Sequence, residues 1–136
     1  IELDIMGTDI DARMVEIAKE NAQKAGVASD ITFKQMRVQD LRSDKINGVI
    51  ISNPPYGERL SDDAGVTKLY AEMGEVFEPL KTWSKFILTS DENFEKKFGR
   101  QADKKRKLYN GTLKVDLYQF FGERVRRQAT SEKGNI

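Results

Sequence analysis

The chain has 136 residues, 33% of them charged, and a formal net charge of +1. Its length suits one domain with a sizeable core, and its balance of charges gives no global signal for a polyanion partner. It contains no cysteine and no histidine, which excludes disulfides, cysteine zinc sites and a Ser–His–Asp triad. No apolar run approaches the roughly 20 residues of a membrane span, so we expect a soluble, cytoplasmic protein that uses no metal.

The first third of the chain predicts a strand, a helix and a second strand. Residues 3–9 form a short apolar run that ends in Asp9, as strands of α/β proteins do. Residues 11–25 carry apolar side chains at helical spacing, and Gly26 stands where a C-cap is expected. Residues 31–36 alternate as a strand. The helix stripe that we expect to face the core consists of Met14, Ile17, Ala18, Asn21, Ala22 and Ala25.

The middle of the chain continues this alternation. The β-branched run at residues 47–52, "NGVIIS", predicts a strand buried on both faces of a parallel sheet. A polar loop over residues 57–65 leads into a helix over residues 66–80, and residues 84–90 predict another buried strand. The apolar positions expected on the second helix are Leu69, Met73, Val76, Phe77 and Leu80.

The last part of the chain predicts a short helix over residues 91–98 and then a hairpin. Asn110-Gly111 stands between two strand-like runs within residues 105–121, and this dipeptide favours a tight type I′ turn. We expect residues 1–125 to form a partial domain, followed by a polar, frayed tail over residues 126–136.

Strands that alternate with helices indicate βαβ units and a mostly parallel sheet. The predicted fold class is therefore α/β, with a Rossmann-like sheet to which the terminal hairpin adds antiparallel strands. In such sheets, ligands bind at the carboxyl ends of the strands.

Polar groups follow three of these predicted strand ends and suit a ligand with a ribose, a flat base and an amino group. Asp9 can accept hydrogen bonds from both ribose hydroxyls, or it can cap the next helix, for which Asp11 is the other candidate. Ile10 can lie against an adenine face or belong to the core. Asp40 can accept from an adenine amine or be a surface carboxylate.

The motif "NPPY" at residues 53–56 follows the most apolar strand. Asn53 and Pro54 each precede a proline, which restricts their backbones to extended conformations and makes the segment rigid. The Asn53 side-chain oxygen and the Pro54 carbonyl can both accept from one planar amino group. Such acceptors stabilise the positive charge that develops when the amine attacks an electrophile, and Tyr56 can stack on the base. The alternative is a strand-terminating turn with a packed tyrosine.

Three segments together resemble a known family. "GTDIDARMVEIAKENAQKAG", "ISNPPYGERL" and "DKKRKLYNG" are similar to the class I methyltransferases that use S-adenosylmethionine, and in particular to the THUMP-associated ribosomal RNA methyltransferases. That family includes the 23S rRNA guanine-N2 methyltransferases and proteins described as adenine-N6-specific DNA methylases. The resemblance covers most of the chain, from about residue 5 to residue 121.

The resemblance implies roles for individual residues. Asp9, Ile10, Asp40 and Asn53 would bind the cofactor. Asn53, Pro54, Pro55 and Tyr56 would form the catalytic motif that holds the target base. Glu58 and Arg59 follow the motif and either contact substrate or form a surface ion pair.

One departure from the family concerns the cofactor. Proteins of this kind carry a Gly-rich loop after their first strand, and only six residues precede "GTDID" here. We therefore expect the C-terminal part of a methyltransferase domain, incomplete at its N-terminus, whose remainder comes from the same protein or from another chain. Alone, such a fragment is expected to be inactive and to bind cofactor weakly or not at all.

Three functions remain open from the sequence. The first is methylation of a guanine N2 in 23S ribosomal RNA, the second is adenine-N6 methylation of DNA or RNA, and the third is a non-catalytic module that binds RNA or protein. Residues 96–107 hold seven Lys or Arg and one Asp, and they either contact RNA phosphates or form a solvated loop.

Overall fold

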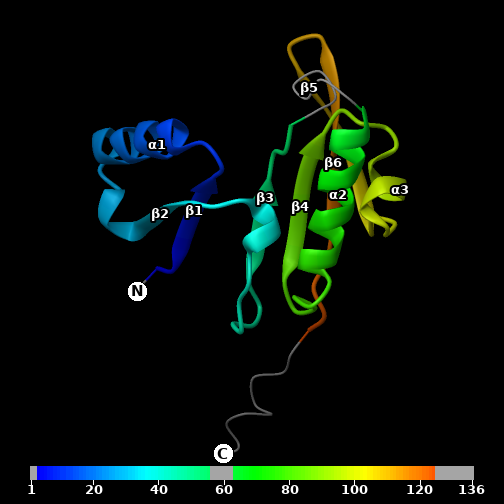
Figure 1. Ribbon diagram of the computed structural model, residues 1–136, viewed down its shortest axis with the longest axis horizontal. Helices are drawn as coiled ribbons and strands as arrows, with labels where there is room; N and C mark the ends of the chain where they lie inside the picture. The colour runs from blue at the N-terminus through cyan, green and yellow to red at the C-terminus, as the bar shows by residue number, and fades with distance from the viewer. Residues whose placement is uncertain (1–2, 56–62, 125–136) are drawn as a thin grey trace, which may run out of the picture. The chain divides into compact units, whose positions relative to one another are not determined.

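The computed structural model describes residues 3–55 and 63–124 (Figure 1). The chain divides into two compact units, Ile1–Arg42 and Ser43–Ile136, each with its own sheet. The predicted tail over residues 126–136 lies outside the described residues.

The first unit has two parallel strands and one long helix. Strand β1 (Ile5–Asp9) pairs with β2 (Ile31–Gln35), and helix α1 (Ala12–Ala25) connects them. Single 3₁₀ turns, η1 (Ala28–Asp30) and η2 (Val38–Asp40), precede and follow β2. The helix ends at Gly26, whose left-handed φ of 77° confirms the expected C-cap.

The buried face of α1 differs from the predicted stripe. Val15 and Ala22 are buried, whereas Met14 and Ile17 are each nearly half exposed. The prediction was wrong for Met14 and Ile17, and also for Asn21 and Ala25, which are exposed. The side of α1 that is buried consists of the smaller residues Val15 and Ala22. Met14 and Ile17 form a second apolar stripe that remains partly exposed in the described chain.

The second unit has four strands in the order β3-β4-β6-β5. Strand β3 (Val49–Ser52) runs parallel to β4 (Ser84–Thr89), while β6 (Leu113–Phe120) runs antiparallel to both β4 and β5 (Lys104–Asn110). Helices α2 (Asp63–Phe77) and α3 (Phe94–Phe98) complete the unit. Parallel strands followed by an antiparallel hairpin match the predicted α/β class, although the strands form two separate sheets.

An aromatic core lies where α2 and α3 pack on β4 and β6. The Phe94 ring lies 4.9 Å from that of Phe98 and 4.8 Å from that of Tyr118, centroid to centroid. Gly74 allows α2 to approach α3, because a Cβ at this position would lie 2.1 Å from the Phe98 carbonyl oxygen. The fully buried aromatic side chains are Tyr70, Phe77, Phe94, Tyr118 and Phe120.

The turn of the hairpin differs from the predicted type. Asn110 pairs with Leu113, so the loop consists of Gly111 and Thr112. Gly111 has a φ of 67°, and Thr112 does not have a positive φ. A type I′ turn requires positive φ at both central residues, so this pattern fits type II′ with glycine first. The hairpin was predicted correctly, but the turn type was wrong.

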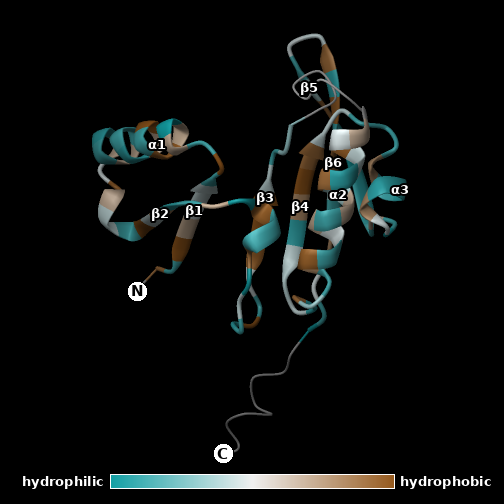
Figure 2. Ribbon diagram, viewed as in Figure 1, coloured by the Kyte–Doolittle hydropathy of each residue, from teal (hydrophilic) through white to brown (hydrophobic). Residues whose placement is uncertain are grey.

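Strand β3 was predicted to be buried on both faces, and this prediction was wrong. Val49 is 59% exposed and Ile51 is 81% exposed, although Figure 2 shows that β3 is hydrophobic like β4. Burial on both faces needs a layer on each side, and the described residues leave most of these two side chains exposed. In the described chain, β3 pairs only with β4, and β1 pairs only with β2. Each of the two strands therefore has one edge without a described partner strand.

Candidate active site

Asp9 is the last residue of β1, and its carboxylate contacts the backbone two residues further along the chain. Its Oδ1 accepts from the Asp11 backbone N–H at 2.8 Å. Asp11, not Asp9, is the N-cap of α1, because its own Oδ1 accepts from the Arg13 N–H at 2.8 Å. The capping alternative for Asp9 is therefore wrong. No described residue donates to the second oxygen of Asp9, which leaves it able to bind a hydroxyl.

Ile10 and Asp40 lie beyond the carboxyl ends of the same two strands. The Ile10 side chain is 64% exposed and is not part of the core, while its carbonyl accepts from Gln35 Nε2 at 3.1 Å. Both Asp40 oxygens accept from the Arg37 guanidinium, at 3.0 and 3.2 Å. These hydrogen bonds lower the pKa of Asp40 below its usual value, so it is an ionised acceptor at neutral pH.

The NPP segment, residues 53–55, follows directly from β3 in the second unit. Asn53 is exposed, Pro54 is buried and Pro55 is half-buried. Because Ser52 lies opposite Ile87 on β4, this segment begins close to the end of β4 at Thr89. The exposed Asn53 thus directly precedes the buried Pro54 at the edge of the sheet where β3 and β4 end.

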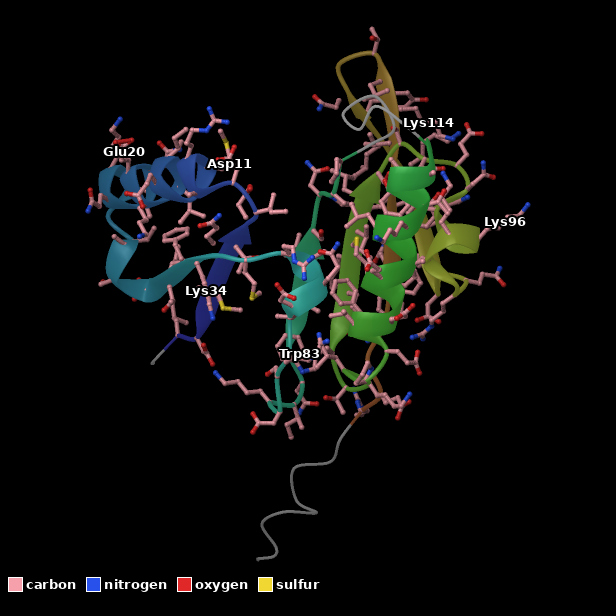
Figure 3. All side chains as sticks on the ribbon, viewed as in Figure 1. Asp11, Glu20, Lys34, Trp83, Lys96 and Lys114 are labelled. Atoms are coloured by element: carbon pink, nitrogen blue, oxygen red, sulfur yellow. The ribbon has the colours of Figure 1, made fainter. Side chains whose placement is uncertain are left out.

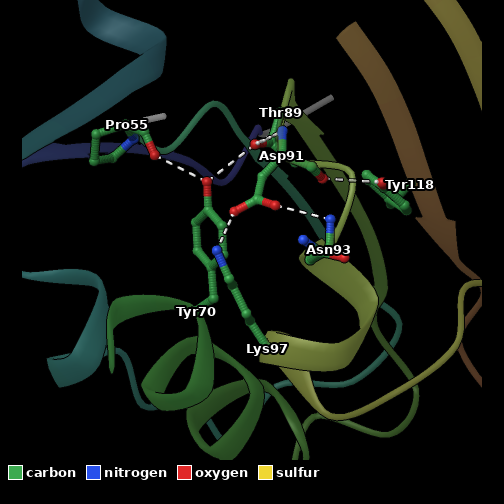
Figure 4. A network of polar contacts seen from close by, with 7 residues as sticks. All are labelled: Pro55, Tyr70, Thr89, Asp91, Asn93, Lys97 and Tyr118. Carbon is green, nitrogen blue, oxygen red and sulfur yellow. Dashed lines mark hydrogen bonds and ion pairs between the residues drawn. The ribbon is translucent and has the colours of Figure 1, made fainter. Parts of the chain in front are cut away.

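The Pro55 carbonyl is fixed by a chain of hydrogen bonds that reaches into the core (Figure 4). It accepts from the Tyr70 hydroxyl at 2.9 Å, and the same hydroxyl lies 3.0 Å from Thr89 Oγ1. Tyr70 has one proton and gives it to the carbonyl, so Thr89 donates to the Tyr70 oxygen. Thr89 in turn accepts from the Asp91 N–H at 3.1 Å. The bonds run in one direction and polarise one another.

Asp91 lies at the other end of this series of hydrogen bonds. Its carboxylate accepts from Lys97 Nζ at 2.6 Å and from the Asn93 N–H at 2.8 Å. Its carbonyl accepts from the Tyr118 hydroxyl at 3.2 Å. Burial raises the pKa of Tyr118 to about 12, so this phenol remains a donor throughout the neutral range. The NPP segment is therefore held by α2, α3, β4 and β6 together.

The sequence predictions missed this support. Tyr70 was not among the apolar positions expected on α2, although it lies four residues after Val66 and three before Met73, all buried. A tyrosine on a buried helical stripe needs a partner for its hydroxyl, and this signal was present in the sequence. Three of the predicted site residues, Tyr56, Glu58 and Arg59, lie outside the described residues.

The basic stretch over residues 96–107 does not form one surface. Lys97 is paired with Asp91, Arg100 lies over the Phe120 ring and Lys105 lies over the Tyr118 ring. Strand alternation places Lys104 and Arg106 on the opposite face of β5 from Lys105 and Lys107. Only part of the stretch therefore remains open to a ligand.

Within residues 3–55 and 63–124, no three acidic side chains gather in a way that could hold a metal ion. Within the same ranges, no helix combines the length and apolar character needed to cross a bilayer.

Comparison with known proteins bears on both fold and function. The family model "UPF0020: RMKL-like, methyltransferase domain" matches residues 1–119. "Putative RNA methyltransferase YpsC" of Bacillus subtilis (strain 168) is 54% identical over 129 residues, which are 94% of this chain and 34% of that protein. "Ribosomal RNA large subunit methyltransferase K/L" of Shewanella amazonensis is 37% identical over 142 residues, with 99% of this chain and 20% of that protein covered.

A solved structure supports the fold. The crystal structure of "SMU.472, a putative methyltransferase complexed with SAH" matches with a TM-score of 0.89 and 67% identity, over 93% of this chain and 33% of that chain. This match confirms the predicted α/β fold class. The chain spans about a third or less of the length of each of these three proteins.

Proposed function

Because this chain belongs to the RMKL-like methyltransferase domain family, we propose that the protein containing it methylates an exocyclic amine of a base in RNA. The proposed donor is S-adenosylmethionine and the proposed target is a guanine N2 of 23S ribosomal RNA. Two observations on relatives support this: one is named a ribosomal RNA large subunit methyltransferase, and a solved neighbour holds SAH, the product that remains after methyl transfer.

The observation that carries the proposal is the anchored NPP segment. Pro54 is buried, the Pro55 carbonyl is held by Tyr70 at 2.9 Å, and Asn53 is exposed at the end of β3. No described residue donates to the Pro54 carbonyl. The segment carries two oxygen acceptors, the Asn53 side chain and the Pro54 carbonyl, on a backbone that Tyr70 fixes before any ligand arrives.

These acceptors suit a planar amine as substrate. When Asn53 and Pro54 each accept a hydrogen bond from one N–H of the amine, the nitrogen lone pair is drawn out of conjugation with the base. The lone pair then attacks an electrophilic methyl group, which S-adenosylmethionine supplies when bound. The same two acceptors stabilise the positive charge on nitrogen, and the surplus proton leaves to water. No histidine base is required, and the chain has none.

The first unit provides residues that fit the cofactor. Asp9 has a carboxylate oxygen without a described donor, suitable for a ribose hydroxyl. Ile10 presents an exposed apolar side chain suitable for an adenine face, and Asp40 is an ionised acceptor suitable for the adenine amine. Asn53 is proposed to border the methyl donor as well as the target. We propose that a cradle for the methionine part comes from residues outside this chain.

The test uses the full-length protein, a 23S rRNA transcript and S-adenosylmethionine with a labelled methyl group. We expect N2-methylguanosine after digestion to nucleosides and mass spectrometry. Asn53→Ala should lower the rate of transfer about 10²- to 10³-fold while leaving S-adenosylmethionine affinity unchanged. Asn21→Ala, an exposed asparagine on α1, is the matched control and should retain wild-type activity.

Other outcomes would redirect the proposal. Labelled N6-methyladenosine would identify the enzyme as an adenine methylase instead. Absence of labelled nucleosides from RNA and DNA, together with retained RNA binding, would favour a non-catalytic module.

A further inference from the structure

The β5–β6 hairpin extends past the edge of the sheet at which the NPP segment lies. Thr89, the last residue of β4, is opposite Asp116, and Asp116 is opposite Lys107. The hairpin tip, residues 107–116, therefore starts level with the end of β4 and continues for several residues. At about 3.3 Å per residue, three residues of β6 project roughly 10 Å beyond β4. Figure 1 shows the hairpin extending past the end of β4.

The tip lies at the same edge of the four-stranded sheet as Asn53. Ser52 is opposite Ile87, so Asn53 follows at about the level of Leu88, just before β4 ends. All of these strands belong to the same four-stranded sheet. A polynucleotide that runs from Asn53 along this edge toward β4 and β6 would meet the hairpin tip.

One face of the tip combines an aromatic ring with two cations, and one of these, the exposed Lys114, lies 3.8 Å from the buried Asp116 carboxylate. Tyr109 is opposite Lys114, and Lys107 is opposite Asp116, so alternation places all four side chains on the same face. Tyr109 is 67% exposed, and Lys107 and Lys114 are exposed as well. Figure 3 marks Lys114 on this part of the hairpin, apart from Lys96 on α3.

Packing explains the aromatic rings at the base of the hairpin but not the ring at its tip. Tyr118 and Phe120 on β6 are fully buried against the helices. Tyr109 lies beyond β4, and in the described chain no other aromatic ring stacks on it. Lysines alone are explained as protection of an edge strand against pairing with other chains, but an exposed tyrosine between two lysines is not.

We propose that the hairpin tip binds a nucleotide that flanks the target base in a single-stranded segment of the RNA. Tyr109 stacks on the flanking base, and Lys107 and Lys114 contact the phosphates on either side of it. An aromatic platform with neighbouring cations is the chemistry by which proteins bind single-stranded nucleic acid. This inference rests on the proposed function and adds a contact that directs the RNA strand across the sheet edge.

The test measures RNA affinity, S-adenosylmethionine affinity and melting temperature of the full-length protein, with a single-stranded 23S rRNA fragment as probe. Tyr109→Ala should weaken RNA binding about tenfold, and Tyr109→Phe should retain it because the ring still stacks. Lys107→Gln should reduce the slope of log affinity against log salt by about 0.7. Lys104→Gln, at the base of the same strand and on its other face, should have a smaller effect on this slope.

The outcomes separate the two proposals. If the wild-type protein methylates the RNA and Tyr109→Ala binds it equally well, the hairpin contact is wrong and the proposed function stands. If Tyr109→Ala lowers the melting temperature and cofactor affinity together with RNA affinity, the tip packs against protein instead, which also overturns the contact. If the wild-type protein neither binds nor methylates RNA, both proposals fail.

Discussion

The Tyr70 hydroxyl in helix α2 donates to the Pro55 carbonyl across 2.9 Å and accepts from Thr89 across 3.0 Å. One buried phenol thus joins the backbone of the proposed catalytic motif to the end of the adjacent strand. The rigidity of the motif depends on this side chain as well as on its two prolines.

Replacing Tyr70 by Phe tests this dependence. The substitution leaves the half-buried Pro55 carbonyl without its donor and the buried Thr89 hydroxyl without its acceptor, which should cost about 1–3 kcal/mol of unfolding free energy. Methyl transfer should slow about ten- to a hundredfold because Asn53 is less well fixed, with unchanged cofactor affinity. Denaturant unfolding and single-turnover rates measure both effects. A wild-type rate would show that the prolines suffice, and exposed Tyr109→Phe serves as the control for stability.

Asp9 and Asp11 offer a matched pair for the cofactor site. Asp9→Asn should weaken S-adenosylmethionine binding to the full-length protein about tenfold or more, because a charge-assisted hydrogen bond to ribose becomes neutral. Asp11→Asn retains an N-cap of similar quality and should leave the affinity unchanged. Calorimetric titration measures both. Equal affinities for the two variants would remove Asp9 from the cofactor site.

The Arg37–Asp40 pair predicts a dependence on acidity. Hydrogen bonding to Arg37 lowers the pKa of folded Asp40, so its stabilising effect is present above the ordinary aspartate pKa of about 3.9. That effect is lost as pH falls through the lowered folded pKa. Arg37→Gln should return the pKa of Asp40 toward its ordinary value, as measured by NMR titration of the carboxyl carbon. An unchanged titration would mean that the pair does not form in solution.

The close approach of α2 and α3 predicts a large effect at Gly74. A Cβ there would meet the Phe98 carbonyl, so Gly74→Ala should displace α3 and lower the unfolding free energy by about 1–3 kcal/mol. Glu75→Ala, the exposed neighbour on the same helix, should change it by less than about 0.5 kcal/mol. Denaturant midpoints distinguish the two variants, and similar midpoints would contradict the predicted clash.

The 136-residue chain by itself gives a further prediction. The full-length protein should bind S-adenosylmethionine, whereas calorimetry on residues 1–136 should detect weak binding or none. Micromolar binding by the chain alone would show that its own residues complete the cofactor cradle.

Local sequence patterns predicted the helices and strands well, but they predicted the turn type and the burial of side chains less well. Alternation of strands and helices, the Gly26 cap and the hairpin at Asn110-Gly111 are all local signals, and the structure contains each of them. The turn type failed because the strand register moved the loop by one residue, to Gly111 and Thr112. A local dipeptide preference cannot report a register that the pairing of long strands decides.

Burial was the harder quantity to predict. The exposure of Ile51 and Met14 depends on which other segments cover β3 and α1, and periodicity cannot supply that information. Likewise, the motif at residues 53–56 pointed to Asn53, but its anchor on Tyr70 depends on tertiary contacts that bring α2 to the strand ends.

The two outer strands of the four-stranded sheet have opposite characters. Strand β5 carries consecutive charges from Lys104 to Lys107, which discourage another strand from adding to that edge. Strand β3 presents Val49, Ile50 and Ile51 at the other edge without a charge. The charged edge of β5 thus disfavours pairing with another strand, whereas the uncharged edge of β3 permits it. If the 136-residue chain is produced alone, we expect self-association through β3, and a lysine introduced at Ile51 should suppress it.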